Sequence, residues 1–233
     1  MFKTRSTEPE RIDTGDYTPD EYSTFLREIK FINRYLGDAR ALRKSLFREV
    51  EGSGLNAFSV LDVACGSGEL LRKTSEFARR TRRKVRLTGI DLNELSFAAV
   101  PTDLGIFYIR GDAFRLPFAD DSFDFAISSL FFHHLADEQI PDVLQEMSRV
   151  ARRGVFVIDL HRNAAAYYLY KVLCRVVRIS PLVSQDGALS IRKGFRIDEL
   201  SRFGEVTRSA PFRLCLSLGY AKTTRINTGV ENS

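Results

Sequence analysis

The chain has 233 residues, of which 44% are hydrophobic and 28% are charged, and this predicts one globular domain with additions at both ends. It contains no run of about 18 uncharged apolar residues, and its first residues lack an apolar core, so we expect neither a transmembrane helix nor a signal peptide. Cys65, Cys174 and Cys215 are too scattered for a disulfide framework or a metal site, which fits a reduced, cytoplasmic protein.

Two helices are predicted before the core. Residues 1–17 are polar and carry a proline and a glycine, which predicts an extended or loose arm. Thr18 is typical of a helix cap, and apolar residues recur at helical spacing from there to Gly37. A second helix, about Ala39–Glu51, is expected to follow with Asp38 as its cap.

Alternating strands and helices are predicted for the core. Short apolar runs separated by helical patterns indicate a mostly parallel sheet covered on both faces. Such a sheet binds ligand at the carboxyl ends of its first and fourth strands, where the strand order reverses. The expected strands are Ser59–Val63, Val85–Asp91, Ile106–Arg110, Phe123–Ser128 and Val155–Leu160, and the expected helices are Ser67–Arg80, Asn93–Ala99 and one that begins near Asp137.

The segment Asn163–Ile179 is unusually apolar for a helix. Lys171, Arg175 and Arg178 form its one narrow polar stripe, so the helix is expected to be buried, paired in a dimer, or lining a lipophilic pocket. After a stop at Pro181, the remainder reads as a short helix at residues 198–200, a closing hairpin of Val206–Ser209 and Phe212–Leu218 with Pro211 at its turn, and a frayed tail from Ala221.

Small residues follow the first core strand and indicate a nucleotide site. The run SVLDVACGSGE at residues 59–69 lets the backbone approach a ligand closely. Asp91 ends the next strand, where a carboxylate can accept hydrogen bonds from a ribose diol. A pyrophosphate fingerprint would need a small residue where Leu71 stands, and Asp62 suits an ammonium or sulfonium group better than a pyrophosphate.

These residues resemble motif I of the class I S-adenosylmethionine (SAM)-dependent methyltransferases, of the small-molecule type. The chain departs from that motif at Ala64, where most members have glycine. The resemblance continues through GIDL at residues 89–92, GDAFRLPF at residues 111–118 and FDFAISSLFFHHL at residues 123–135. A Rossmann-like domain that binds another nucleotide, or none, is the alternative.

The resemblance implies an α/β fold, with a Rossmann-like doubly wound, mostly parallel seven-stranded sheet, an antiparallel C-terminal strand and extra N-terminal helices. It divides the chain into an arm with cap helices (1–54), a SAM-binding core (55–160), a helical insertion or lid (161–202) and a closing hairpin with tail (203–233). In similar enzymes the extra N-terminal helices help to enclose substrate, although here they could simply pack against the core.

The resemblance also implies that SAM is the cofactor and S-adenosylhomocysteine its product. Asp62 would contact the methionine end together with the loop residues Ala64, Cys65, Gly66 and Gly68, and Ser129 would line the same side. Asp91 would bind the ribose, Leu92 would pack on the adenine, and Asp112 with the backbone of Ala113 would bind the adenine edge. Two alternatives stay open: Asp112 could only cap a turn, and Asp62 could only be a core acceptor.

Histidines at the end of the fourth strand are the candidate catalytic groups. His133 and His134 follow that strand, and Asp159 ends the neighbouring strand, so a carboxylate can orient an imidazole that takes a proton. This arrangement resembles small-molecule O-methyltransferases of natural-product pathways. His161 is a further candidate, and the alternative is that His133-His134-Leu135 is only a structural turn. No metal is expected.

The sequence therefore predicts methyl transfer to a hydroxyl, phenolic in class, of a small and partly lipophilic molecule of secondary metabolism. A C-methyltransferase of the ubiquinone/menaquinone type is the alternative, disfavoured because that family has an arginine–asparagine pair where this chain has His133-His134. A macromolecule methyltransferase or a SAM-binding protein without turnover stays open. The net charge of +5 is interpreted as a solvated face, so no nucleic-acid partner is expected, whereas a homodimer is possible.

Overall fold

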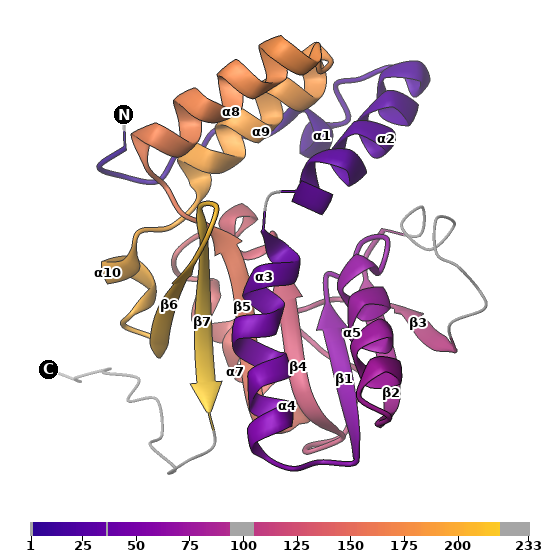
Figure 1. Ribbon diagram of the computed structural model, residues 1–233. Helices are drawn as coiled ribbons and strands as arrows, with labels where there is room; N and C mark the ends of the chain where they lie inside the picture. Colours follow the sequence, from indigo (N-terminus) through magenta and orange to yellow (C-terminus); the bar gives the residue numbers. More distant parts are fainter. Residues whose placement is uncertain (1, 36, 94–104, 220–233) are drawn as a thin grey trace, which may run out of the picture.

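The computed structural model describes residues 2–35, 37–93 and 105–219. Its centre is a seven-stranded sheet with the order β3-β2-β1-β4-β5-β7-β6, in which β1 to β5 are parallel and β7 runs antiparallel to both β5 and β6 (Figure 1). The strands are β1 (Ala57–Val63), β2 (Lys84–Asp91), β3 (Ile106–Arg110), β4 (Phe123–Ser129), β5 (Ala151–Leu160), β6 (Glu205–Ser209) and β7 (Arg213–Gly219). The expected fold class is confirmed.

The central strands are buried on both faces, which explains their nearly continuous apolar sequences. Alternate residues of one strand belong to different cores: Val60 packs beneath α5 (Glu69–Arg80), and Leu61 packs on the side of α7 (Ile140–Val150). The order reverses between β1 and β4, so the carboxyl ends of these two strands diverge at one edge of the sheet. The expected helix at Asn93–Ala99 and the tail from Ala221 fall outside the described residues, apart from Asn93 itself.

The helices before the core agree with the predicted pattern except at one cap. Thr18 begins α2 (Pro19–Tyr35): its hydroxyl accepts from the Glu21 N–H and its own N–H donates to the Glu21 carboxylate. A continuous helical segment follows as α3 (Asp38–Leu42), the π-helical η1 (Arg43–Phe47) and α4 (Arg48–Gly52). Asp38 was expected to cap this segment, but its buried carboxylate instead pairs with Arg213 of β7.

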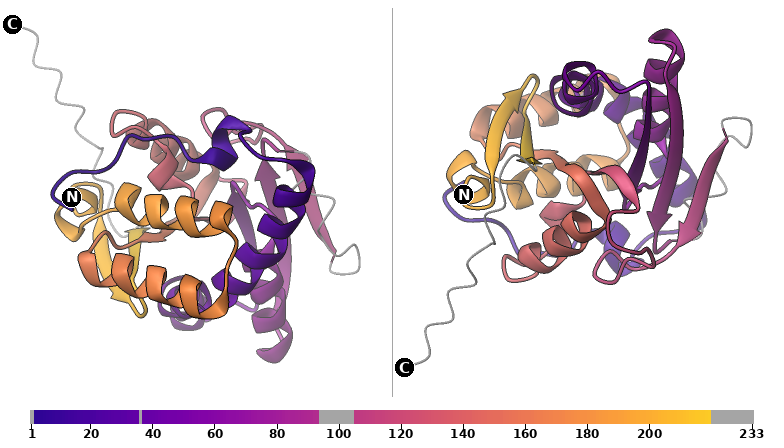
Figure 2. Two further views of the ribbon diagram at one scale, coloured as in Figure 1. Left: turned by 90° about the horizontal axis from the view of Figure 1, so that it is seen from above. Right: turned by 90° about the horizontal axis from the view of Figure 1, so that it is seen from below.

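Of the two alternatives expected for residues 1–17, an extended or a loose arm, the loose one is wrong for the described residues 2–17, which are held by specific contacts. The arm runs across the carboxyl end of the sheet and includes the short helix α1 (Arg11–Thr14) (Figures 1 and 2). The Ser6 N–H donates to the carbonyl of Arg192, the carboxylate of Asp186 accepts from the backbone at Arg11 and Ile12, and Glu10 is buried. The partners all lie far along the chain, so no local sequence pattern announces them.

Helices from the C-terminal part complete this cover. They are α8 (Ala164–Val177) and α9 (Pro181–Lys193), which Figure 2 shows side by side above the sheet, whereas α10 (Ile197–Leu200) packs against the core on the α7 side. The sequence did not predict α9. Gly187 in its middle, a weak helix former, allows close approach of Tyr170 from α8, because a Cβ there would lie 2.1 Å from the tyrosine hydroxyl oxygen. Within the described residues, no helix has both the length and the hydrophobicity that a membrane crossing requires.

Candidate active site

A first cavity of about 350 Å³ opens at the carboxyl ends of β1 and β2, beside the point where the strand order reverses. Among the residues expected to bind cofactor, it brings together Ala64, Asp91, Leu92, Asp112 and Ala113. These come from three separate loops, which follow β1, β2 and β3. Five of the residues predicted to bind the nucleotide therefore line one hollow in the fold.

The loop after β1 turns sharply along one wall of this cavity. Ala64, Gly66 and Gly68 all have positive φ values, of 57°, 50° and 70°, so the chain follows a left-handed path that glycine adopts without strain. Ala64 adopts the same left-handed conformation although it carries a Cβ, so its departure from the family motif introduces backbone strain. The Asp91 carboxylate accepts from the Gly66 N–H at 2.8 Å and from the Asn93 N–H at 2.9 Å, so it fixes this turn to the end of β2.

Asp62 and Cys65 lie beneath this turn. Burial and the nearby charge of Asp91 raise the pKa of the Asp62 carboxyl well above its usual range. Burial, together with both carboxylates, also raises the pKa of the Cys65 thiol, and its sulfur faces the sheet near Gly89. A cationic group bound above the turn would stabilise the ionised form of Asp62, so the acidic environment fits the sulfonium and ammonium of SAM. Cys65 can contact a ligand there only through its backbone.

The remaining cofactor candidates differ in what their side chains do. Leu92 is exposed at the rim, as expected of a residue that would pack on a base. The Asp112 carboxylate accepts from the Phe114 N–H at 3.0 Å, so one of its oxygens does cap a turn, which was the alternative. The hydroxyl of Ser129 at the end of β4 is buried and has no hydrogen-bond partner among the described residues, so it is an available donor on that side.

A second cavity, of about 370 Å³, lies next to the first under the helical cover. Its wall is mostly apolar and is built by α2, α8 and α9 with the loops after β4 and β5. The two cavities share Asp13, Leu130 and His134 as wall residues. A small ligand in the second cavity would therefore face a cofactor in the first across these three side chains.

His133 and Asp159 meet at the floor of the second cavity. His133 lies in a short 3₁₀ helix, η3 (Phe132–His134), and its Nδ1 is 2.7 Å from Asp159 Oδ1, while its backbone N–H donates to Oδ2 at 3.1 Å. Burial opposes ionisation of Asp159, but its interactions with the His133 side chain and the hydrogen bond from the Leu160 N–H keep its pKa below the usual range. An ionised carboxylate can only accept, so Nδ1 carries a hydrogen and Nε2 of the neutral ring is left as the basic nitrogen.

His134 has a different partner, which the sequence did not suggest. Its Nδ1 is 3.1 Å from Asp13 Oδ2, and Lys193 places its ammonium 3.6 Å from that oxygen and 3.2 Å from Glu10 Oε1. Burial lowers the pKa of His134, but the hydrogen bond to Asp13 and the charges of Glu10 and Asp13 outweigh it and raise the pKa overall. The arm predicted to be loose thus contributes two carboxylates beside the histidines.

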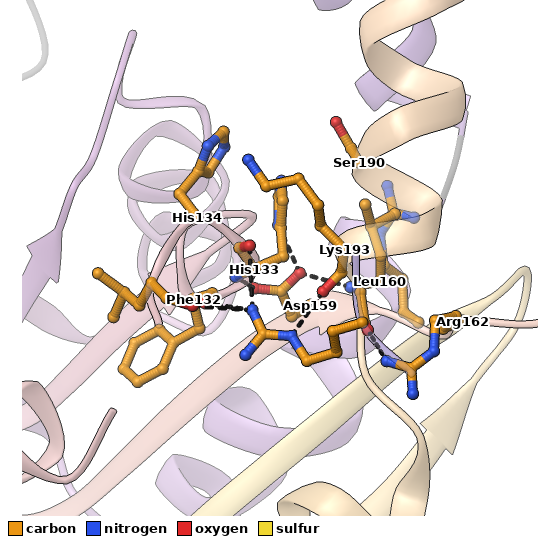
Figure 3. A network of polar contacts seen from close by, with 12 residues as sticks. Phe132, His133, His134, Asp159, Leu160, Arg162, Ser190 and Lys193 are labelled. Atoms are coloured by element: carbon orange, nitrogen blue, oxygen red, sulfur yellow. Dashed lines mark hydrogen bonds and ion pairs between the residues drawn. The ribbon is translucent and has the colours of Figure 1, made fainter. Parts of the chain in front are cut away.

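Figure 3 shows the polar network that fixes this loop. Arg5 from the arm donates to the carbonyls of His133 at 3.0 Å and Leu135 at 2.9 Å, and also to the carbonyl of Lys193 at 2.8 Å. Arg162, fully buried, donates to the carbonyl of Gly194. Because these bonds tie the arm, the histidine loop and the end of α9 together, the ring of His133 has a defined position.

His161, the further candidate, also lines the second cavity but has no carboxylate partner in the described structure. It forms a β-bridge with Phe195, and burial with the charges of Arg208, Arg162 and Arg196 lowers its pKa. The structure thus brings the expected pair of His133 and Asp159 together and leaves His161 apart from it.

Comparison with known sequences gives a consistent family. Residues 60–154 match the family described as a methyltransferase domain. The chain is 32% identical to a 2-phytyl-1,4-naphtoquinone methyltransferase of Synechocystis sp. over 183 residues, covering 70% of this chain and 69% of that protein. It is 28% identical to a demethylmenaquinone methyltransferase of Desulfitobacterium hafniense over 157 residues, covering 64% of this chain and 59% of the relative. Across several such curated relatives, the match spans only about half of their length.

Solved structures agree on the fold. The plantazolicin methyltransferase BpumL, crystallised with S-adenosylhomocysteine, superposes with a TM-score of 0.60 at 17% identity and covers 79% of this chain and 67% of its own. The magnesium protoporphyrin IX methyltransferase of Synechocystis PCC 6803 gives a TM-score of 0.55 at 14% identity and covers 87% of this chain and 95% of its own. With the strand order, the loop after β1 and the matched domain in agreement, the chain belongs to the class I SAM-dependent methyltransferases.

Proposed function

We propose that this protein transfers a methyl group from SAM to a hydroxyl, phenolic in class, of a small lipophilic molecule, with His133 as the general base and Asp159 as the residue that orients it. The observation that carries the proposal is the buried contact of 2.7 Å between His133 Nδ1 and Asp159 Oδ1 at the floor of an apolar cavity that adjoins the cofactor cavity. When bound, SAM supplies an electrophilic methyl group on a sulfonium and leaves as S-adenosylhomocysteine.

The residues of this chain divide the remaining tasks. Asp91 and the loop from Ala64 to Gly68 hold the cofactor, and the buried acid Asp62 favours its positive end. His133 Nε2 accepts the proton of the substrate hydroxyl as the oxygen–methyl bond forms, and Asp159 stabilises the imidazolium that results. The proton rests on Nε2 until solvent removes it after product leaves.

The second cavity supports the lipophilic part of the proposal. Ile29, Leu169, Leu173 and Ile191 present hydrocarbon to it, and His133 and His134 are among its polar wall residues. A ligand that buries a ring or chain against these residues could place a hydroxyl at His133, whose Nε2 offers it a hydrogen bond. The helical cover over the cavity also excludes water from the reacting atoms.

C-methylation of a hydroxylated ring is the second candidate, and it is favoured by the likeness to a relative named as a ubiquinone/menaquinone biosynthesis C-methyltransferase. Both reactions begin in the same way, because His133 would remove a proton from a phenol in each. They differ in which atom of the phenolate then attacks, oxygen or a ring carbon. The position of the substrate ring relative to the cofactor would decide between them.

The test combines product analysis with a matched pair of histidine variants. Purified protein is incubated with SAM and separate panels of phenols and quinols, and NMR of the product distinguishes an O-methyl from a C-methyl group. His133→Ala is expected to lower kcat by about 10²–10⁴-fold. The same variant should leave the Kd for SAM unchanged. The matched control, His161→Ala, should keep most of the wild-type activity. An unchanged rate in His133→Ala removes that residue as the base, and a thermal shift with SAM but no product from either panel argues against a small-molecule methyltransferase.

A further inference from the structure

Helix α8 presents an unusually apolar outer face. Among the described residues, six of the ten exposed large hydrophobic side chains belong to this one helix: Tyr168, Leu169, Val172, Leu173, Val176 and Val177. Val176 is 75% exposed and Tyr168 is 59% exposed, so most of the surface of these two residues is accessible to solvent. Exposed apolar surface this concentrated is typical of an interaction site, whereas single exposed hydrophobic residues are not.

The six residues form one continuous stripe along the helix. At about 100° per residue, they span roughly half of the helix circumference, and the buried Ala166, Tyr170 and Cys174 adjoin one side of the stripe. The helix lies over the carboxyl end of the sheet beside α9, and no other described element covers it in the view from above (Figures 1 and 2). The stripe is therefore accessible along its whole length.

Positive charge borders the stripe on its other side. Lys171 and Arg175 on α8 are both exposed, and Arg178 follows directly at the end of the helix. The sequence of α8, AAAYYLYKVLCRVV, contains no acidic residue. Glu28 of α2 is the carboxylate that reaches this end, and it accepts from the Ser180 N–H. An apolar stripe with cations along one border is the pattern of a helix that lies in the interface of an anionic membrane.

The apolar stripe is continuous with the second cavity. Leu169 and Leu173 are exposed on the outer surface and at the same time line the cavity, at the edge where the stripe meets the buried side of the helix. A hydrocarbon chain can thus pass from the outer face of α8 to the histidines along an apolar surface. This link to a lipophilic substrate rests on the proposed function, whereas the docking itself does not.

We propose that the face of α8 formed by these six residues with Lys171, Arg175 and Arg178 docks on the surface of an anionic lipid bilayer. A second copy of the chain fits this face less well. An isologous pairing would bring the same cations together, and a helix of 14 residues offers only a few hundred Å² per partner against roughly 800 Å² in a stable interface. A bilayer needs neither shape complementarity nor a large rigid area.

The test measures binding of the full chain to sucrose-loaded vesicles, without substrate or turnover. Wild-type protein is expected to sediment with phosphatidylcholine vesicles that contain phosphatidylglycerol, and much less with phosphatidylcholine alone or at high salt. Because each basic residue near such a surface contributes about fivefold in partitioning, Lys171→Glu/Arg175→Glu should lower the partition coefficient by at least about 25-fold. Val172→Glu/Val176→Glu, which removes the apolar contact, should also abolish sedimentation.

The matched control is Arg79→Glu/Arg80→Glu on α5, which makes the same change of charge at exposed positions away from α8. It should retain most of the binding. The proposal is overturned when wild-type protein stays in the supernatant with anionic vesicles, or when the α5 variant loses as much binding as the α8 variants. A concentration-dependent dimer that Val172→Glu/Val176→Glu dissolves, without vesicle binding, would assign the face to a second copy instead. All variants should keep the wild-type Tm and the thermal shift with SAM, so a failure of docking is distinct from a failure of the enzyme.

Discussion

Replacing Asp159 by asparagine tests whether the candidate base, His133, depends on its buried carboxylate partner. The carboxylate accepts three hydrogen bonds: Oδ1 from His133 Nδ1–H and from the Leu160 N–H at 2.7 Å each, and Oδ2 from the His133 N–H at 3.1 Å. An amide of the same shape has only one acceptor oxygen. Whichever way the introduced amide turns, its NH₂ group faces a backbone N–H, so at least one buried donor loses its acceptor.

The two orientations of the amide have different chemical consequences. With its oxygen toward Nδ1, the tautomer of His133 survives, but the imidazolium formed in the reaction loses the charge that stabilises it. With its NH₂ toward Nδ1, that nitrogen must become the acceptor and Nε2 then carries the hydrogen, so it cannot act as a base. Both cases lower kcat, and we expect a loss of about 10²–10⁴-fold. The unpaired buried donor should lower the free energy of unfolding by about 1–3 kcal/mol.

The assay measures kcat, the Kd for SAM and denaturant unfolding in parallel. Asp159 lies outside the first cavity, so SAM affinity should stay at the wild-type value. Asp13→Asn is the matched control, because it makes the same change at the half-exposed partner of His134, and we expect it to alter kcat by less than about fivefold. If Asp159→Asn is destabilised as expected but keeps a kcat close to that of wild type, Asp159 is a structural residue and His133 does not depend on it for catalysis.

Three further predictions follow from the two cavities. Asp91→Ala removes the carboxylate that fixes the turn after β1 and should raise the Kd for SAM by about 10–100-fold in calorimetry; an unchanged Kd would place the ribose elsewhere. Leu173→Trp fills part of the second cavity and should raise KM without changing the Kd for SAM, whereas Val176→Trp, at the outer surface, should leave KM unchanged. The folded-state pKa of His134 is raised and that of Asp13 is lowered, so their pairing adds most to folding stability between about pH 4 and 6.5 and is lost as the pH rises through the raised pKa of the histidine. His134→Gln should therefore lower Tm more near pH 6 than near pH 9. An equal loss of Tm at both pH values would mean that the pair does not ionise as described.

The sheet and the first cavity were predictable because their signals are local. β1 is a short apolar run that leads directly into small residues, and in a parallel sheet the ends of β1, β2 and β3 must meet at one edge. His133 and Asp159 could be paired from sequence for the same reason, because they follow neighbouring strands. Nothing beyond strand order was needed to bring them together.

The helical cover was less predictable because its signals are not local. Glu10 and Asp13 lie in a polar segment without periodicity, and their partners Lys193 and His134 are far along the chain. The sequence of α9 also contains Gly187, which weakens the helical pattern in the sequence. The glycine is needed because the Tyr170 ring leaves no room for a Cβ at this position. Binding residues contributed by such segments become visible only after the fold has brought them over the sheet.

The different carboxylate partners of the two histidines argue for different roles. His133 is held by a fully buried acid at the floor of the second cavity, so under the proposed function its ring has one orientation and one tautomer in which to accept a proton. His134 lies on the wall between the cavities against the half-exposed Asp13, and its raised pKa favours the protonated ring, which cannot act as a base. Because Asp13 belongs to the N-terminal arm, the His134 contact links that arm to the wall that the two cavities share. The proposed function therefore gives proton removal to His133 and not to His134, and the two differ in the burial of their carboxylate partners: Asp159 is fully buried and Asp13 is half-exposed.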